Sequence, residues 1–208
     1  MNDPTPQPDH EVPGESPSTR LARAVLRDEP DALDAWFRGE HPRVWKVCFG
    51  MLADAEEADD VAQDAMLHLS DRLTRWDPER PYDAWRNTVV ANLCRDRMRK
   101  IGARQEAERQ VMRDADAFGL PDSLPDPAAT AANREVREVL RSVLSMLSPR
   151  EREVYVLRDL EGGDTKVVAT ALGITESSVR SILTLARRRL RHVIGSKLPG
   201  LVPDGGEA

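Results

Sequence analysis

Cysteine and aromatic residues are scarce in this sequence of 208 residues. The only two cysteines, Cys48 and Cys94, lie far apart in the chain, and the four histidines do not cluster with them. Structural zinc sites and disulfide frameworks need several such residues at close spacing. We therefore predict no metal site and no cofactor, and the sparse cysteine content fits a reducing compartment.

Long apolar runs are also absent. No stretch approaches the roughly 20 apolar residues of a membrane-crossing helix. The N-terminal MNDPTPQPDHEVPGESPSTR has neither the basic nor the apolar segment of a secretory signal. Residues 1–18 carry five prolines among acidic and small polar residues, which predicts a disordered tail. We expect a cytoplasmic protein with no membrane partner.

The alternation of apolar and polar residues that is typical of strands is missing as well. Apolar residues instead recur every three or four positions in two blocks, residues 19–101 and 134–197. Residues 102–133 contain GLPDSLPDPAAT, whose prolines and aspartates predict a linker, although RQEAERQVMRDADAF before it also fits a polar helix. We predict an all-α fold of two small, separately packed helical domains, a flexible linker and a frayed tail at 198–208.

The second block has the pattern of a helix-turn-helix. Ser148, Pro149 and Glu151 form a capping box with proline at the first helical position, and this helix ends at Gly162-Gly163. A short helix capped by Asp164 or Thr165 then ends at Gly173, where a left-handed backbone is tolerated. A long third helix begins at residue 176 after a three-residue turn.

That third helix is basic, although the whole chain has a net charge of −6. No acidic residue occurs between residues 177 and 203. Val179, Ile182, Leu183, Ala186 and Leu190 form one apolar stripe. The other face has hydroxyl side chains near its start and arginines further along, the order that suits reading base edges and holding phosphates. The predicted DNA contacts are Thr175, Ser177, Ser178, Arg180, Ser181, Thr184, Arg187, Arg188 and Arg191; Arg189, beside the stripe, should contribute least.

Two oppositely charged segments lie in the first block. Residues 47–71 contain seven acids and no Lys or Arg, whereas residues 86–104 contain six basic residues and one acid. DNA would repel the acidic segment, so we expect a protein partner for it. The candidate docking residues are Asp59, Asp60, Gln63 and Asp64.

These segments resemble regions 2.2 and 2.4 of the extracytoplasmic-function (ECF) class of bacterial sigma factors, in the sigma-70 family. The resemblance rests on A-D-D-V-A-Q-D at 58–64 and then on Trp85, Asn92, Asp96 and Arg99. Residues 147–190, with LSPREREV and ALGIT, resemble region 4 of the same family. The order and spacing match, and the long region 3 is missing, as the class requires.

The resemblance implies a transcription initiation factor that catalyses no covalent chemistry and has no small-molecule substrate. It implies docking on the largest-subunit clamp and the flap of core RNA polymerase. The first domain would recognise and melt the minus-10 promoter element, and the second would bind the minus-35 element. It also implies an anti-sigma partner.

The minus-10 contacts follow from the resemblance and from the preference of unstacked bases for aromatic platforms and basic groups. Trp85 lies on an i, i+4, i+8 stripe with Val89 and Leu93, which we expect to face the core. Trp76 and Tyr82, in a proline-containing loop, fit either core packing or base contact. The full predicted set is Trp76, Tyr82, Arg86, Asn92, Arg95, Asp96, Arg97, Arg99 and Lys100.

Two alternatives remain open at this stage. A ligand-responsive helix-turn-helix regulator would bind DNA without polymerase, but it leaves the acidic motif around Asp60 and Gln63 unexplained. An all-helical hydrolase would need a compact set of inward Asp, Glu and His ligands, and the Asp64–His68 pair lacks a third ligand. Ile182 stands where the family often has a basic residue, so the promoter sequence is not predicted.

Overall fold

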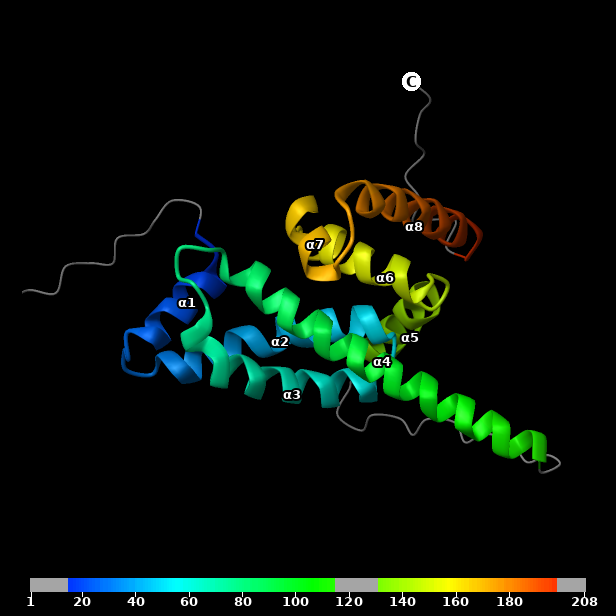
Figure 1. The fold of residues 1–208 in the computed structure, drawn as a ribbon, viewed down its shortest axis with the longest axis horizontal. Coiled ribbons are helices and arrows are strands. Elements are labelled where there is room, and N and C mark those ends of the chain that lie inside the picture. Colours follow the sequence, from blue (N-terminus) through cyan, green and yellow to red (C-terminus); the bar gives the residue numbers. More distant parts are fainter. Residues whose placement is uncertain (1–14, 115–130, 198–208) are drawn as a thin grey trace, which may run out of the picture.

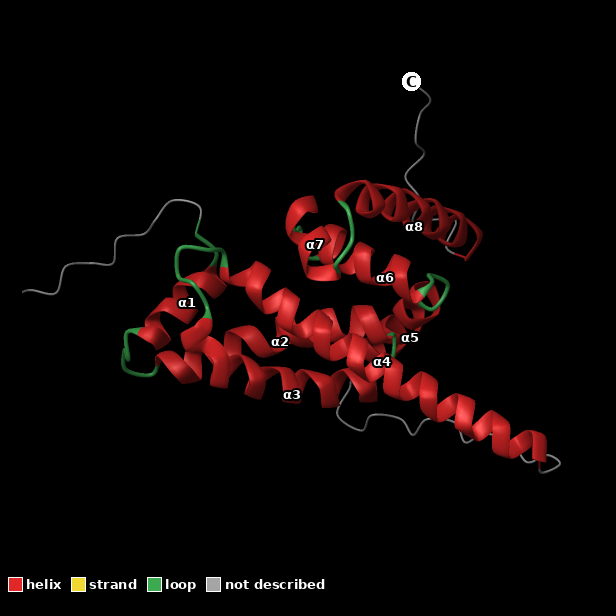
Figure 2. Cartoon of the chain, in the orientation of Figure 1, coloured by secondary structure: helices red, strands yellow, loops and turns green. Residues whose placement is uncertain are grey.

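The structure is a computed structural model that describes residues 15–114 and 131–197. Most of the predicted N-terminal tail, residues 115–130 of the predicted linker and the tail at 198–208 lie outside these ranges. Within them the regular elements are all helical (Figure 2), which confirms the all-α prediction. None of the helices described is both long and apolar enough to cross a membrane.

Four α-helices build the first block. Ser16 caps the first of them, which has Pro17 at its first position, and Asp54 caps the third through the backbone N–H of Glu57. The second helix packs against the other three. The elements are α1 (Pro17–Leu26), α2 (Ala32–Leu52), α3 (Ala55–Arg72), the 3₁₀ turn η1 (Leu73–Arg75) and α4 (Tyr82–Asp114).

Helix α4 is longer than the predicted domain. It passes through the boundary expected at residue 102 and continues to Asp114, so residues 104–114 of the stretch that also fitted a polar helix are helical, and the rest of that stretch lies outside the described residues. Exposed i, i+3 and i, i+4 ion pairs, Arg104–Glu108 and Arg109–Glu106, support this extension. It projects beyond the other helices (Figure 1).

The second block follows the predicted helix-turn-helix. The Ser148–Glu151 capping box is present, Asp164 caps the second helix, and Gly173 adopts φ 63°, as its position required. One turn after Tyr155 is π-helical, which the sequence pattern did not predict. The elements are α5 (Ala131–Leu144), α6 (Pro149–Tyr155), η2 (Val156–Leu160), α7 (Thr165–Leu172) and α8 (Glu176–Lys197).

The two blocks do not pack separately, which corrects the prediction. Helices α6 and α7 lie on α2 and α4 (Figure 1), and buried side chains of both blocks belong to one apolar cluster. The blocks approach closely at Gly50, where an added Cβ would come within 2.8 Å of Val156 Cγ2. Glycine on α2 therefore lets the second block sit directly on the first.

The two cysteines, far apart in sequence, meet inside the first block. Cys48 on α2 and Cys94 on α4 are both fully buried in the apolar cluster. A hydrogen bond with the Cys94 thiol and burial together raise the pKa of the Cys48 thiol well above its usual range. Cys48 is therefore held as an unreactive thiol.

Candidate nucleic-acid and polymerase interfaces

The predicted reading face of α8 is exposed. Val179, Leu183, Ala186 and Leu190 are buried on the opposite side, as the apolar stripe predicted. The start of the helix is fixed by Thr175, whose hydroxyl accepts a hydrogen bond from the Ser178 N–H at 3.2 Å. Figure 1 shows α8 on the side of the second block that faces away from α1–α4. Of the predicted DNA contacts, Ser178 is half-buried and all the others are exposed: Thr175, Ser177, Arg180, Ser181, Thr184, Arg187, Arg188 and Arg191.

Several arginines of α8 already have carboxylate partners. Arg187 binds Asp159 through two nitrogens, at 2.8 and 2.7 Å, and this bonding raises its pKa. Arg180 lies 3.4 Å from Glu176 on its own helix, in an exposed pair of the kind that contributes little. Arg180 is therefore easily released for another acceptor, whereas Asp159 positions Arg187 more firmly.

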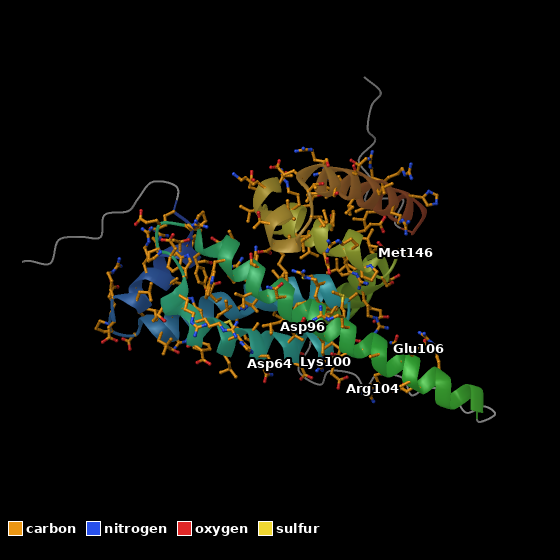
Figure 3. All side chains as sticks on the ribbon, in the orientation of Figure 1. Asp64, Asp96, Lys100, Arg104, Glu106 and Met146 are labelled. Atoms are coloured by element: carbon orange, nitrogen blue, oxygen red, sulfur yellow. The ribbon has the colours of Figure 1, made fainter. Side chains whose placement is uncertain are left out.

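Helix α3 presents a narrow acidic face. Asp60, Gln63 and Asp64 are exposed on it, and Figure 3 labels Asp64. Leu67 lies on the same face, because residues 60, 63, 64 and 67 have the i, i+3, i+4, i+7 spacing of one side of a helix. Its side chain is 61% exposed. We call these four residues the α3 face. Asp59 lies beside it, half-buried, and accepts a hydrogen bond from the Trp45 indole N–H.

The sequence prediction missed Leu67. From the sequence, a leucine next to an acidic motif is expected to lie in the core. Only the structure shows that Leu67 is on the exposed side of α3. A large exposed apolar side chain among carboxylates suits a protein partner better than a nucleic acid.

The predicted aromatic platform is buried, which corrects the idea that Trp76 and Tyr82 are available to bases. Trp76 is 3% exposed and donates its indole N–H to the Arg80 carbonyl at 3.1 Å. Tyr82 is fully buried and accepts from the Trp36 indole at 3.1 Å. Each polar tip has an internal partner, so both rings pack as core residues. Trp85 is half-buried against the cluster, in line with its predicted role.

Arg86 is also buried rather than free for DNA. Its guanidinium contacts Glu40 at 3.0 Å, Asp83 at 3.1 Å and Glu161 at 2.9 Å, and it donates to the Asn87 side chain at 3.0 Å. Glu40 is on α2, and Glu161 follows η2 in the second block. No local pattern predicts this site, because the three carboxylates lie far apart along the chain.

The other predicted minus-10 residues line α4 further along. Arg95 donates to the Asn92 side chain at 2.8 Å and to the Ala171 carbonyl of α7 at 2.7 Å. Arg99 pairs with Asp96, and Lys100 is exposed; Figure 3 labels Asp96 and Lys100 on this helix.

Arg97 joins α4 to α3. It pairs with Glu57 and, at 2.9 Å, with Asp60 of the α3 face. The hydrogen bond to Glu57 raises the pKa of Arg97. The predicted DNA-binding and polymerase-docking surfaces therefore share an ion pair.

Comparison with known families decides between the alternatives. Residues 36–104 match the model of sigma-70 region 2, and residues 137–190 match that of sigma-70 region 4. The ECF RNA polymerase sigma factor SigL of Mycobacterium tuberculosis is 33% identical over 155 residues, which cover 73% of this chain and 83% of SigL. This chain belongs to the ECF sigma factors of the sigma-70 family. SigM of the same species is 26% identical over 181 residues, or 87% of this sigma factor and 86% of SigM.

Solved structures agree with the fold. This sigma factor superposes on CnrH, solved in complex with the cytosolic domain of CnrY, with a TM-score of 0.60 and 21% identity, over 86% of this chain and 98% of CnrH. It superposes on RpoE of Bartonella quintana, solved with the anti-sigma factor NepR, with a TM-score of 0.61 and 19% identity, over 80% and 99% of the two chains. The region 2 match spans most of α2, all of α3 and the larger part of α4, and the region 4 match runs from within α5 to within α8.

Proposed function

We propose that this sigma factor binds core RNA polymerase, recognises minus-35 and minus-10 promoter elements with its two regions, and nucleates promoter melting. The observation that carries this proposal is the ordered pair of regions 2 and 4, each with an exposed face of suitable chemistry. Because it works on promoter DNA, it acts in the cytoplasm.

Minus-35 recognition is assigned to the exposed face of α8. Short hydroxyl side chains at its start approach base edges, while Arg188 and Arg191 near its other end contact phosphates. Arg180 is the residue with the reach for a bidentate contact to a guanine, once it leaves Glu176.

Minus-10 recognition is assigned to the exposed part of α4. Asn92, Asp96, Arg99 and Lys100 remain accessible on this helix. The burial of Trp76 and Tyr82 assigns them instead to holding the start of α4 in place.

Polymerase docking is assigned to the α3 face. Its carboxylates suit the basic clamp of the polymerase largest subunit, and Leu67 supplies an apolar contact at the same surface. Region 4 offers a second apolar surface at Val139, Leu140 and Met146, which are 40%, 46% and 39% exposed and suit the flap.

A protein inhibitor is a further proposed partner. Both solved relatives named above were captured with a second protein, an anti-sigma factor in the case of RpoE. An inhibitor of this chain would act by covering the α3 face or the exposed face of α8.

Run-off transcription tests the function. Purified bacterial core polymerase, a genomic promoter library and this protein should together yield discrete transcripts that neither polymerase nor protein gives alone. Silence across the library, with the same polymerase active on another sigma factor, would contradict the proposal.

One variant and its control test polymerase docking. Asp60→Arg with Gln63→Ala should abolish co-purification with core polymerase, because an arginine replaces one of the two carboxylates of the α3 face and cancels the charge of the other. Asp34→Asn, on an exposed carboxylate of α2 that pairs with Arg38 of the same helix, is the matched control and should leave co-purification unchanged.

A further inference from the structure

A cavity of about 420 Å³ lies between the start of α4 and the loop that leads into α7, and its walls come from both regions. This volume falls within the range of small-molecule sites in proteins, about 300–1,000 Å³. We propose that the cavity binds a small organic cation, an amine or guanidine that also carries an apolar group and an acceptor oxygen. The ligand is bound and not converted, so the site adds to the proposed function and does not depend on it.

The charged side chains of the cavity wall are all acidic. Asp83 lies on the α4 side, and Glu161 and Asp164 lie on the side of the second block. No lysine or arginine lines the cavity in the described part of the chain. The wall therefore attracts a cation and repels an anion.

Arg86 is the buried cation behind this wall, and three carboxylates share it. Its guanidinium lies 3.0 Å from Glu40, 3.1 Å from Asp83 and 2.9 Å from Glu161. Lys46 also lies 3.5 Å from Glu161, but the lysine side chain is 56% exposed, so water screens its charge. One buried guanidinium cannot neutralise three carboxylates. The wall thus keeps negative charge that a cationic ligand would compensate.

The Asn87 side chain offers a hydrogen-bond donor to the cavity. Asn87 is 8% exposed and lines the cavity. Its side-chain oxygen accepts from Arg86 Nε at 3.0 Å, so its NH₂ group is turned away from Arg86. This NH₂ group has no hydrogen-bond partner among the described residues. A few fixed polar groups of this kind orient a ligand in its site, and here the group requires an acceptor oxygen on the ligand.

Apolar side chains form much of the remaining wall. Leu157 and Val168 are each 2% exposed, whereas Val167, at 36%, lies nearer the solvent. A ligand gains affinity when it buries an apolar group against these side chains. The described residues include no group of three or more His, Cys, Asp or Glu that could hold a metal ion. The wall therefore suits an organic cation better than a metal ion.

Calorimetric titration of the whole chain tests the site. The probe is the methyl ether of phenylalaninol, which combines an ammonium group, an acceptor oxygen and a phenyl ring. We expect one molecule to bind per chain with a Kd of about 1 mM or lower. The N-acetyl derivative of the probe carries no charge and should bind at least about tenfold more weakly. No saturable binding of the probe, or equal binding of the two compounds, would overturn the proposal.

A bulky substitution tests the location. Val167→Trp adds a large ring to the cavity wall at a partly exposed position, so it should block the probe and weaken binding at least about tenfold. Leu33→Trp is the matched control, because it adds a similar ring to α2 at a position 49% exposed and away from the cavity. It should leave the Kd unchanged. Thermal unfolding checks that both variants fold, and an unchanged Kd in the folded Val167→Trp protein would refute this location.

A charge variant that keeps its helix cap gives an independent check. Asp164 caps α7, and asparagine is an equally good cap, so Asp164→Asn removes a charge from the wall without weakening the helix. The probe should bind about threefold more weakly, because Asp164 is exposed and its attraction is partly screened. The neutral N-acetyl derivative should not respond. Equal binding of the probe to Asp164→Asn and to the unaltered protein would contradict the charge argument.

Asn87→Asp tests the hydrogen bond to the ligand. The substitution keeps an acceptor for Arg86 and replaces the NH₂ donor by an oxygen. The unaltered protein should bind the probe about fivefold more tightly than phenethylamine, which is the same amine without the ether group. This preference should disappear in Asn87→Asp, and a preference that persists would refute the role of Asn87.

The outcomes separate the ligand site from the proposed function, because binding is measured without polymerase or DNA. If the probe binds at the cavity but the protein supports no run-off transcription, the ligand site stands and the proposed function is wrong. If the protein supports transcription but binds no probe, the function stands and the ligand site is wrong.

Discussion

Replacing Arg86 with methionine should destabilise region 2 strongly, because Arg86 neutralises a buried carboxylate that has no other ion-pair partner among the described residues. Glu40 is fully buried on α2. One of its carboxylate oxygens accepts from Arg86 at 3.0 Å, and the other has no hydrogen-bond partner among the described residues. Arg86→Met fills much of the same space but leaves Glu40 as a buried, uncompensated charge.

The expected loss in the free energy of unfolding follows from the isolation of the Glu40 carboxylate. Removing one partner of a buried ion pair costs about 3–5 kcal/mol, because the remaining charge keeps its desolvation cost without its attraction. Asp83, 32% exposed, is solvated after the change and adds little. The double variant Arg86→Met with Glu40→Met should recover most of the loss, since replacing both charges by apolar groups of similar volume is often neutral or stabilising.

Urea unfolding monitored by tryptophan fluorescence measures these differences, and all four tryptophans lie in the first block. The matched control is Arg38→Met, which breaks an exposed ion pair with Asp34 on the same helix and should cost about 0–1 kcal/mol. A loss below about 1 kcal/mol for Arg86→Met, or a double variant no more stable than the single one, would refute the buried-charge argument.

Three other outcomes are expected. Leu67→Ala should weaken binding to core polymerase about tenfold, as judged by titration, because a leucine buried on docking contributes about 1.5–3 kcal/mol; Leu33→Ala, 49% exposed on α2, should not. Arg180→Ala should relax base preference at one minus-35 position at a cost of about 1–3 kcal/mol, and unaltered preference on mutated promoters would count against that contact. Ser148→Ala should lower the thermal stability of region 4 by about 0.5–2 kcal/mol, because it removes the capping box of α6, and an unchanged calorimetric midpoint would contradict this.

Local signals in the sequence were sufficient for the helix-turn-helix. Ser148, Asp164 and Gly173 act at helix ends through neighbours a few residues away, so their roles can be read without knowing the fold. The apolar stripe of α8 was predictable for the same reason, since its period matches that of the helix.

The surface of region 2 was less predictable, because burial there depends on distant partners. From the sequence, Arg86 is one of six basic residues expected near DNA, but its ion pairs with Glu40 and Glu161 hold it in the interior. Trp76 lies just after η1 and Tyr82 begins α4, and the burial of Tyr82 depends on α1 and α2, through Thr19 and Trp36, which no local pattern reveals. Leu67 is the opposite case, since an apolar residue expected in the core is exposed in the structure.

The position of Arg97 indicates an order of events for the proposed function. Arg97 is a cation of α4, the helix for which we propose minus-10 recognition, but Glu57 and Asp60 of α3 hold it in the free protein. A phosphate must compete with two carboxylates for this arginine, in a chain whose net charge of −6 already opposes DNA. Docking of the α3 face on a basic polymerase surface gives Asp60 a new partner and weakens its hold on Arg97. The shared ion pair therefore favours polymerase docking first and contact between α4 and promoter DNA second.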